Sequence, residues 1–309
     1  MIFFIFENTL INDENICTFI FLKTNKKQPI LHYSFMKKIL IPTDFSEHAE
    51  HALKVAAQIA RKHNGEIILL HMLELPNQTG DAVSSGHAIP EIMFFKNAAL
   101  AKLESIMDSP LLEGLKVSEI VQFELAFDGI LNLIKKNDID LIVMGSHGAS
   151  GFKDMFVGSN AEKVVRYSEV PVLIIKKEIP AFNVQKFVFA SDFSDEVKAP
   201  FEKVVEFANK FDTELHLVMI NTPNSFKSTL VAREIMDRFT EGFQIKKFST
   251  HIFNDANVEK GILNFSNSIN ADLIGMCTHG RKGLAHFFNG SISEDLVNHA
   301  VRPVITFKI

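Results

Sequence analysis

The residues best placed to do chemistry are glycines that follow an apolar segment near the middle of the chain. Gly145 comes directly after the apolar residues 141–144, Gly148 lies three positions further on, and Gly158-Ser159 follows after nine intervening residues. Glycines after a buried strand let the backbone approach a ligand and present N–H groups to it. A helix start adds unpaired N–H groups and the positive end of a dipole. The spacing therefore favours a site for nucleotide phosphates; the alternative is a strand-to-helix loop with glycine turns and Ser159 as N-cap.

Two histidines and a cysteine in similar loops raise the question of catalysis. His147 and His279 belong to no HxxxH or HExxH spacing and have no cysteine–histidine cluster around them, so we expect polar loop residues rather than metal ligands or acid–base catalysts. Cys277 as a nucleophile would need a lowered pKa and a paired base, and a small buried residue is the simpler expectation. The sequence predicts no catalytic residue and no metal ligands.

The chain contains an internal repeat. The segment around Asp44 recurs around Asp192, an offset of 148 residues (192 − 44). The segments after Gly129 recur after Gly261, an offset of 132 (261 − 129), so the second copy lacks about 16 residues between its second and third strands. We therefore predict two copies of one domain.

Apolar runs that are typical of buried strands alternate with segments of helical periodicity in both copies. The predicted first-copy strands are 39–41, 66–73, 118–125, 141–144 and 170–175, with helices near 49–60, 91–107, 129–136 and 158–167. The second copy is predicted as strands 186–190, 214–220, 247–253, 272–276 and 301–307, with helices 196–210, 227–240, 258–268 and 291–299. This order predicts two tandem Rossmann-like α/β domains, each a doubly wound five-stranded parallel sheet that binds ligands at the carboxyl ends of its strands.

The domain boundaries follow from the repeat. We expect domains at 36–177 and 186–309, joined by a short linker at 178–185. Residues 1–35 carry interrupted apolar runs, and Met36 begins a segment that reads like the start of a protein. We therefore interpret 1–35 as a loosely packed extension, or as sequence upstream of the true start.

Composition narrows the function classes. The 309 residues carry a formal net charge of −5 and no strongly basic patch, so nucleic acid is a poor candidate partner. No window is apolar for long enough to span a membrane. Two cysteines cannot build a disulfide framework, which indicates a reducing compartment and a cytoplasmic protein. The 29 phenylalanines are expected to fill the core.

The chain resembles the universal stress protein family in its tandem two-domain form. Residues 36–46 resemble the opening strand of that family, and residues 140–148 and 170–175 resemble its hallmark segments. The resemblance covers 36–309. It implies that the two copies pair through their last strands as an internal pseudo-dimer, which leaves dimerisation of the whole chain optional.

The resemblance also implies an adenine-nucleotide site. In ATP-binding members the glycine motif holds ribose and phosphates, and the loop after the first strand holds adenine. Matched positions that would hold the nucleotide here are Pro42, Thr43, Asp44, Met144, Gly145, Ser146, His147, Gly148, Gly158, Ser159 and Asn160. Without the resemblance, Asp44 is equally well read as a cap of the following helix.

The second copy departs from this pattern. Its matched positions are Asp192, Gly280, Gly290 and Ser291, but Cys277 stands where the first copy has Gly145. A Cβ there would crowd backbone that must approach ribose or phosphate, so we expect weak nucleotide binding or none in the second copy.

The function that this reading predicts is stress-response regulation through ATP or AMP binding, with Mg²⁺ held mainly by the phosphates. Bound nucleotide would order the loop 146–158 and change the surface offered to protein partners. Two alternatives remain: a slow ATPase or nucleotidyl-transfer enzyme in the same pocket, and a nucleotide-free interaction scaffold.

Overall fold

The computed structural model describes residues 36–73, 89–123, 126–146, 158–278 and 296–309. The interpretation of 1–35 as an extension falls outside these ranges, as does most of the helix expected at 291–299, of which residues 296–299 are helical.

Strands and helices alternate along both halves of the chain, as the periodicities predict. The first half contains β1 (Lys38–Pro42), α1 (Glu47–His63), β2 (Glu66–Met72), α3 (Ile89–Met107), β3 (Lys116–Gln122), α4 (Ala126–Asn137), β4 (Leu141–Gly145), α5 (Ser159–Tyr167) and β5 (Val172–Ile175). The second contains β6 (Lys186–Ala190), α6 (Lys198–Phe211), β7 (Glu214–Asn221), α7 (Thr229–Thr240), β8 (Phe248–Asn254), α8 (Val258–Ser268), β9 (Leu273–Thr278) and β10 (Val304–Lys308). Short 3₁₀ turns lie at Pro110–Leu112 and Asp195–Val197.

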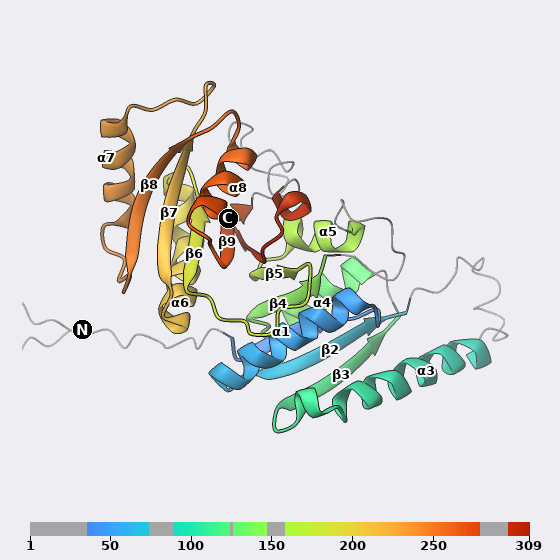
Figure 1. Ribbon diagram of the computed structural model, residues 1–309. Helices are drawn as coiled ribbons and strands as arrows, with labels where there is room; N and C mark the ends of the chain where they lie inside the picture. The colour runs from blue at the N-terminus through green and yellow to red at the C-terminus, as the bar shows by residue number, and fades with distance from the viewer. Residues whose placement is uncertain (1–35, 74–88, 124–125, 147–157, 279–295) are drawn as a thin grey trace, which may run out of the picture. The chain divides into compact units, whose positions relative to one another are not determined.

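The strands form one ten-stranded sheet in the order β3-β2-β1-β4-β5-β10-β9-β6-β7-β8 (Figure 1). All pairings inside each half are parallel. The halves join through an antiparallel pair of β5 and β10, in which Leu173 lies opposite Ile305. The predicted α/β class and the pairing of the last strands are therefore confirmed, and both strands are shorter at their starts than expected.

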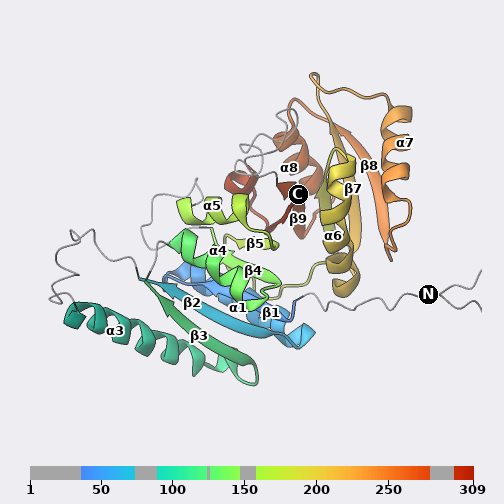
Figure 2. The same ribbon diagram turned by 180° about the vertical axis from the view of Figure 1, so that it is seen from behind.

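Helices cover both faces of the sheet because successive strand residues point to opposite sides. Ile39 and Ile41 belong to one buried apolar cluster, with residues of α1, α3, α6 and α7. Leu40 between them belongs to a second cluster, with residues of α4, α5 and α8. Figure 2 shows the same elements from behind. This layered arrangement leaves the loops at the carboxyl ends of the strands to form sites.

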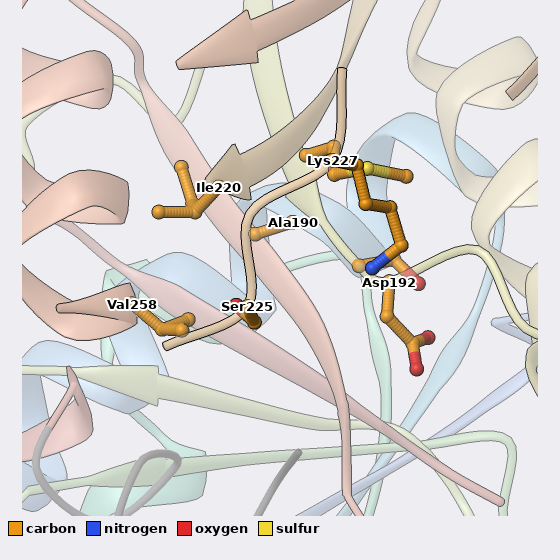
Figure 3. A pocket seen from close by; sticks show the side chains of 8 residues that line it. Ala190, Asp192, Ile220, Ser225, Lys227 and Val258 are labelled. Carbon is orange, nitrogen blue, oxygen red and sulfur yellow. The ribbon is translucent and has the colours of Figure 1, made fainter. Parts of the chain in front are cut away.

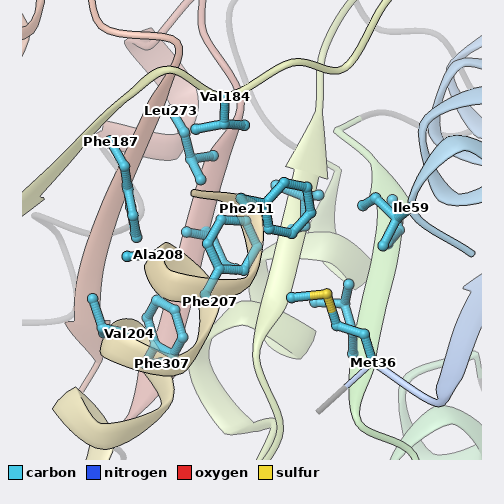
Figure 4. Packing of buried hydrophobic residues seen from close by; sticks show 14 of the residues in the cluster. Met36, Ile59, Val184, Phe187, Val204, Phe207, Ala208, Phe211, Leu273 and Phe307 are labelled. Carbon is cyan, nitrogen blue, oxygen red and sulfur yellow. The ribbon is translucent and has the colours of Figure 1, made fainter. Parts of the chain in front are cut away.

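The first apolar cluster runs across both halves (Figure 4). Phe211 at the end of α6 has its ring centroid 4.8 Å from that of His63 at the end of α1, and the Lys62 Nζ lies 4.9 Å from the Phe211 ring centroid. Phe187, Phe207 and Phe307 are fully buried in the same cluster. Phe187, Phe207, Phe211 and Phe307 are therefore core residues, as expected from the composition, whereas Phe226 and Phe248 are exposed.

No helix among the residues that the structure describes is long and apolar enough to cross a membrane.

Candidate functional site

Three segments of the first half converge at the carboxyl edge of its sheet. The loop after β1 carries Thr43 and Asp44, and β4, which pairs directly with β1, ends at Gly145. The backbone N–H of Gly158 donates to the carbonyl oxygen of Ser146 at 2.7 Å, which ties the start of α5 to the end of β4. The structure thus brings together both ends of the glycine motif and the loop after the first strand.

The loop after β1 is a tightly hydrogen-bonded turn. The Oγ1 of Thr43 accepts from the N–H of Phe45 at 3.1 Å, and Oδ1 of Asp44 accepts from the N–H of Ser46 at 3.1 Å. Ser46, rather than Asp44, caps α1, because its Oγ accepts from the N–H of Ala49 at 3.3 Å. The reading of Asp44 as the helix cap is therefore wrong. Its carboxylate instead accepts a hydrogen bond from the backbone of the capping residue, Ser46.

The same turn recurs in the second half. The Oγ of Ser191 accepts from the N–H of Phe193 at 2.9 Å, and Oδ1 of Asp192 accepts from the N–H of Ser194 at 3.1 Å. These polar side chains therefore have a structural role that does not depend on a ligand.

Gly145 is needed for close packing against helix α1. A Cβ on Gly145 would lie 2.7 Å from the carbonyl carbon and oxygen of His48. From the sequence, we expected this glycine to allow close approach of a ligand. The structure adds another cause, because the missing side chain lets the first turn of α1 lie directly against the end of β4.

Gly158 occupies the N-cap position of α5, with φ −59° and ψ 144°, and Ser159 is the first helical residue. The alternative that Ser159 caps this helix is therefore wrong. Glycine has no side chain that could accept from the first-turn N–H groups, and such groups favour anions. Asn160 in the same turn is exposed.

The other predicted site residues occupy different depths. Ser146 is fully buried, Met144 is 6% exposed within the second apolar cluster, and Pro42 is the half-buried last residue of β1. His147, Gly148 and the side chain of Ser159 lie outside the described residues, as do Gly280, Gly290 and Ser291 of the second copy.

His71 borders the candidate site and was not expected from the sequence. Its Nδ1 lies 2.8 Å from the carbonyl oxygen of Thr43, and its ring centroid lies 4.4 Å from that of Phe45. The Lys102 Nζ of α3 lies 5.0 Å from the same Phe45 ring centroid. His71 thus supports the loop from the end of β2. The sequence feature that could have indicated this role is a histidine near the end of a predicted strand, at a position where the second copy has Met219.

The corresponding region of the second half is a narrow pocket (Figure 3). Lys227 and Asp192 lie on one side of it, and Ile220 and Val258 lie on the other. Its cavity volume is about 20 Å³, room for about one water molecule.

A short hydrogen-bonded loop after β7 borders this pocket. The Asn221 amide nitrogen donates to the carbonyl oxygen of Lys227 at 2.9 Å, and the Asn221 Oδ1 accepts from the N–H of Lys227 at 3.2 Å. The hydroxyl oxygens of Thr222 and Ser225 lie 2.9 Å apart. The loop is thus fastened at its base by the buried Asn221.

Cys277 occupies the position of Gly145 in the second half, and the adjoining helix begins differently. Where α1 begins at Glu47, the second half has a 3₁₀ turn over Asp195–Val197 before α6 begins at Lys198. The Cys277 side chain is 5% exposed. Burial, with a smaller contribution from Asp192, raises the pKa of its thiol, which opposes a nucleophilic role. Across the described parts of the chain, no group of three His, Cys, Asp or Glu side chains could hold a metal ion.

Comparison with known proteins gives a consistent result across both halves. The universal stress protein family model matches residues 36–176 and 183–308. Universal stress protein MJ0577 of Methanocaldococcus jannaschii is 33% identical over 155 residues, which cover 46% of this chain and 96% of that protein. Universal stress protein Slr1230 of Synechocystis is 23% identical over 303 residues, which cover 88% of this chain and 100% of that protein.

A solved structure aligns with most of the chain. The crystal structure of a universal stress protein from Archaeoglobus fulgidus matches with a TM-score of 0.68 and 25% identity, and it covers 88% of this chain and 98% of its own. Because the family model matches both halves, the chain belongs to the universal stress protein family, in a tandem form with two family domains.

Proposed function

We propose that the first half binds an adenine nucleotide, ATP or AMP, and that the protein acts as a stress-response regulator through nucleotide-dependent partner binding. The observation that carries this proposal is the convergence of the β1 loop, the end of β4 and the start of α5 at one sheet edge. The bond from Gly158 N–H to Ser146 O closes the base of the intervening loop. Phosphates would lie at the start of α5, with Mg²⁺ held mainly by the phosphates.

The second half differs at the matched positions. The described residues that line its pocket leave room for about one water molecule, and Cys277 stands where the first half has Gly145. We therefore assign one nucleotide to each chain, bound by the first of two domains at 36–177 and 186–309.

The cysteine content supports a cytoplasmic location. Cys277 is a free, buried thiol, and two cysteines in 309 residues are typical of a reducing compartment. We assign the protein to the cytoplasm.

The test is to denature the purified protein and to identify any released nucleotide by chromatography and mass analysis. About one ATP or AMP per chain supports the assignment, and about two would contradict the contrast between the halves. No nucleotide, together with no thermal shift on added ATP, would overturn the proposal in favour of a scaffold.

A matched pair of variants locates the site. Gly158→Val adds a β-branched side chain at the start of α5 and should abolish binding while the fold is kept. Val258→Ala, on the pocket of the second half, should leave the affinity unchanged. An unchanged affinity in Gly158→Val would contradict the site.

A further inference from the structure

Two histidines and a serine meet near the outer edge of the second half. The Nδ1 of His216 on β7 lies 3.2 Å from the Nε2 of His251 on β8. The Oγ of Ser249 lies 3.0 Å from that His216 nitrogen and 2.9 Å from that His251 nitrogen. His216 is directly opposite Ser249 in the strand pair, and His251 is two residues further along β8. The three side chains therefore share one face of the sheet.

The first half shows that the fold itself does not require these histidines. The strand register places Ile68, Ser118 and Ile120 at the positions of His216, Ser249 and His251. Only the serine is shared. Two isoleucines occupy the equivalent positions in the first half, so the polar cluster is specific to the second half.

The surroundings of both imidazole rings favour the neutral form. Burial lowers the pKa of His216 and the pKa of His251, and the nearby His216 ring lowers the pKa of His251 further. A neutral imidazole offers a lone pair to a metal ion, whereas a protonated one does not. The His251 ring also packs on Phe265 of α8, with ring centroids 4.9 Å apart. This contact holds the ring in place.

The three atoms hydrogen-bond to one another, and their separations also suit one metal ion that would replace these hydrogen bonds. Two imidazole nitrogens about 2.0–2.1 Å from a tetrahedral zinc ion are about 3.3 Å apart, close to the 3.2 Å separation of the two nitrogens here. The other nitrogen of His216, Nε2, is buried and makes no hydrogen bond with the described residues, while Oε2 of Glu214 lies 3.6 Å from it. A carboxylate on the far nitrogen of a ligating histidine is a common outer partner in metal sites.

We propose that His216 Nδ1 and His251 Nε2 bind one divalent transition-metal ion of the zinc type, with Ser249 Oγ and water completing its coordination. The ion would join the edge strand β8 to β7. The charged groups nearby oppose each other: Glu214 favours a cation, and Lys186 on β6 disfavours it. The Lys186 Nζ is held by the carbonyl oxygen of Ile269 at 3.0 Å. Because only two nitrogen ligands come from the protein, binding should be weaker than at a four-ligand structural zinc site.

The test uses the full chain without a histidine tag, first stripped with a chelator. Zn²⁺ is titrated by calorimetry, and Co²⁺ binding is followed by visible absorption, which reports the coordination geometry. We expect one Zn²⁺ per chain, a tetrahedral Co²⁺ spectrum that Zn²⁺ displaces, and a higher unfolding temperature with Zn²⁺.

Variants separate this site from incidental binding. His216→Ile and His251→Ile install the residues of the first half and should each abolish the Co²⁺ spectrum, while circular dichroism shows an intact fold. Glu214→Gln should weaken Zn²⁺ binding about tenfold. His299→Gln removes a different histidine, which pairs with Glu259 at 2.6 Å, and should change nothing.

Two results would overturn the proposal. One is no Zn²⁺ binding to the wild-type chain. The other is binding that persists in both isoleucine variants. If His216→Ile fails to fold, His251→Gln takes its place, because glutamine keeps a polar group beside Ser249 but lacks the imidazole nitrogen. A retained Co²⁺ spectrum in that variant equally contradicts the site.

Discussion

Lys176 and Lys308 make equivalent hydrogen bonds across the interface between the two halves, each to a backbone carbonyl oxygen of the half that contains the other lysine. The Nζ of Lys176, just after β5, donates to the carbonyl oxygen of Asn298, and the Nζ of Lys308 on β10 donates to the carbonyl oxygen of Arg166 at 3.0 Å. Both pairs are related by the 132-residue repeat (308 − 176 and 298 − 166). Each amine meets carbonyl groups at the C-terminal end of a helix from the other half, where a positive charge is favoured.

Stability should depend on pH through Lys176. Burial lowers the pKa of Lys176 to about 8, below its ordinary value of 10.5. The unfolded chain therefore binds more protons between about pH 8 and 10.5, so the contribution of this group to stability rises with pH across that window. In urea unfolding, the free energy of unfolding of the wild type should increase relative to that of Lys176→Met from pH 8 to 10. Lys177 is exposed, so the dependence of the unfolding free energy on pH should be the same in Lys177→Met as in the wild type. The same dependence in Lys176→Met and the wild type would contradict the lowered pKa of Lys176.

Gly275 and Phe187 form a size-matched pair in the core of the second half. A Cβ on Gly275 would lie 2.5 Å from Cε2 of Phe187, and the same repeat positions in the first half are Val143 and Ile39. Gly275→Val should cost about 1–3 kcal/mol through overpacking. Phe187→Ile alone should also destabilise by leaving a cavity.

The double variant Phe187→Ile with Gly275→Val recreates the pair of the first half. It should recover at least about 1 kcal/mol relative to the sum of the single changes, because the two side chains are in contact. Chemical denaturation of all four proteins measures this coupling. Strict additivity would show that the two residues are not matched in size.

Gly145→Ala should destabilise the first half. The new Cβ would meet the backbone of His48 at 2.7 Å, so the first turn of α1 must move. We expect a loss of about 1–3 kcal/mol in the free energy of unfolding, with weaker ATP binding in a thermal-shift titration. Cys277→Gly changes the repeat position in the second half and should leave ATP binding intact. Wild-type stability and affinity in Gly145→Ala would contradict this packing role.

His71→Met tests the support beneath the β1 loop. It removes the contact with the Thr43 carbonyl oxygen and installs the residue that the second half carries, Met219. One hydrogen bond within the protein is worth about 1 kcal/mol of folding stability, so the free energy of unfolding should fall by about that amount. The nucleotide affinity should also fall, because the β1 loop loses its support. The reciprocal Met219→His is the control, and calorimetric titration with ATP distinguishes them. An unaltered affinity would remove His71 from the site.

Local patterns predicted most of the fold. Alternating periodicities and the repeat indicated the element order and the α/β class, and the pairing of β5 with β10 followed from the family resemblance. The start of α6 was less predictable: the helix expected at 196–210 begins as a 3₁₀ turn over Asp195–Val197, and no local pattern in the sequence marks the change to α-helix at Lys198.

The candidate site was predicted only in part. Glycine spacing located Gly145 and Gly158, but the contact of Gly145 with α1 requires the position of His48. His71 has no neighbouring motif, and its role depends on Thr43, 28 residues away. His216 and His251 are 35 residues apart, so no spacing rule for metal ligands applies to them.

The place of β10 has a consequence for synthesis on the ribosome. It is the last of the described strands to emerge, yet it lies between β5 and β9 in the sheet. Until residues 304–308 leave the exit tunnel, the β5 edge of the first half lacks its neighbour and β9 lacks the strand beside it. Unpaired strand edges promote association between chains. The nascent protein is therefore expected to need protection by chaperones until its final strand is in place.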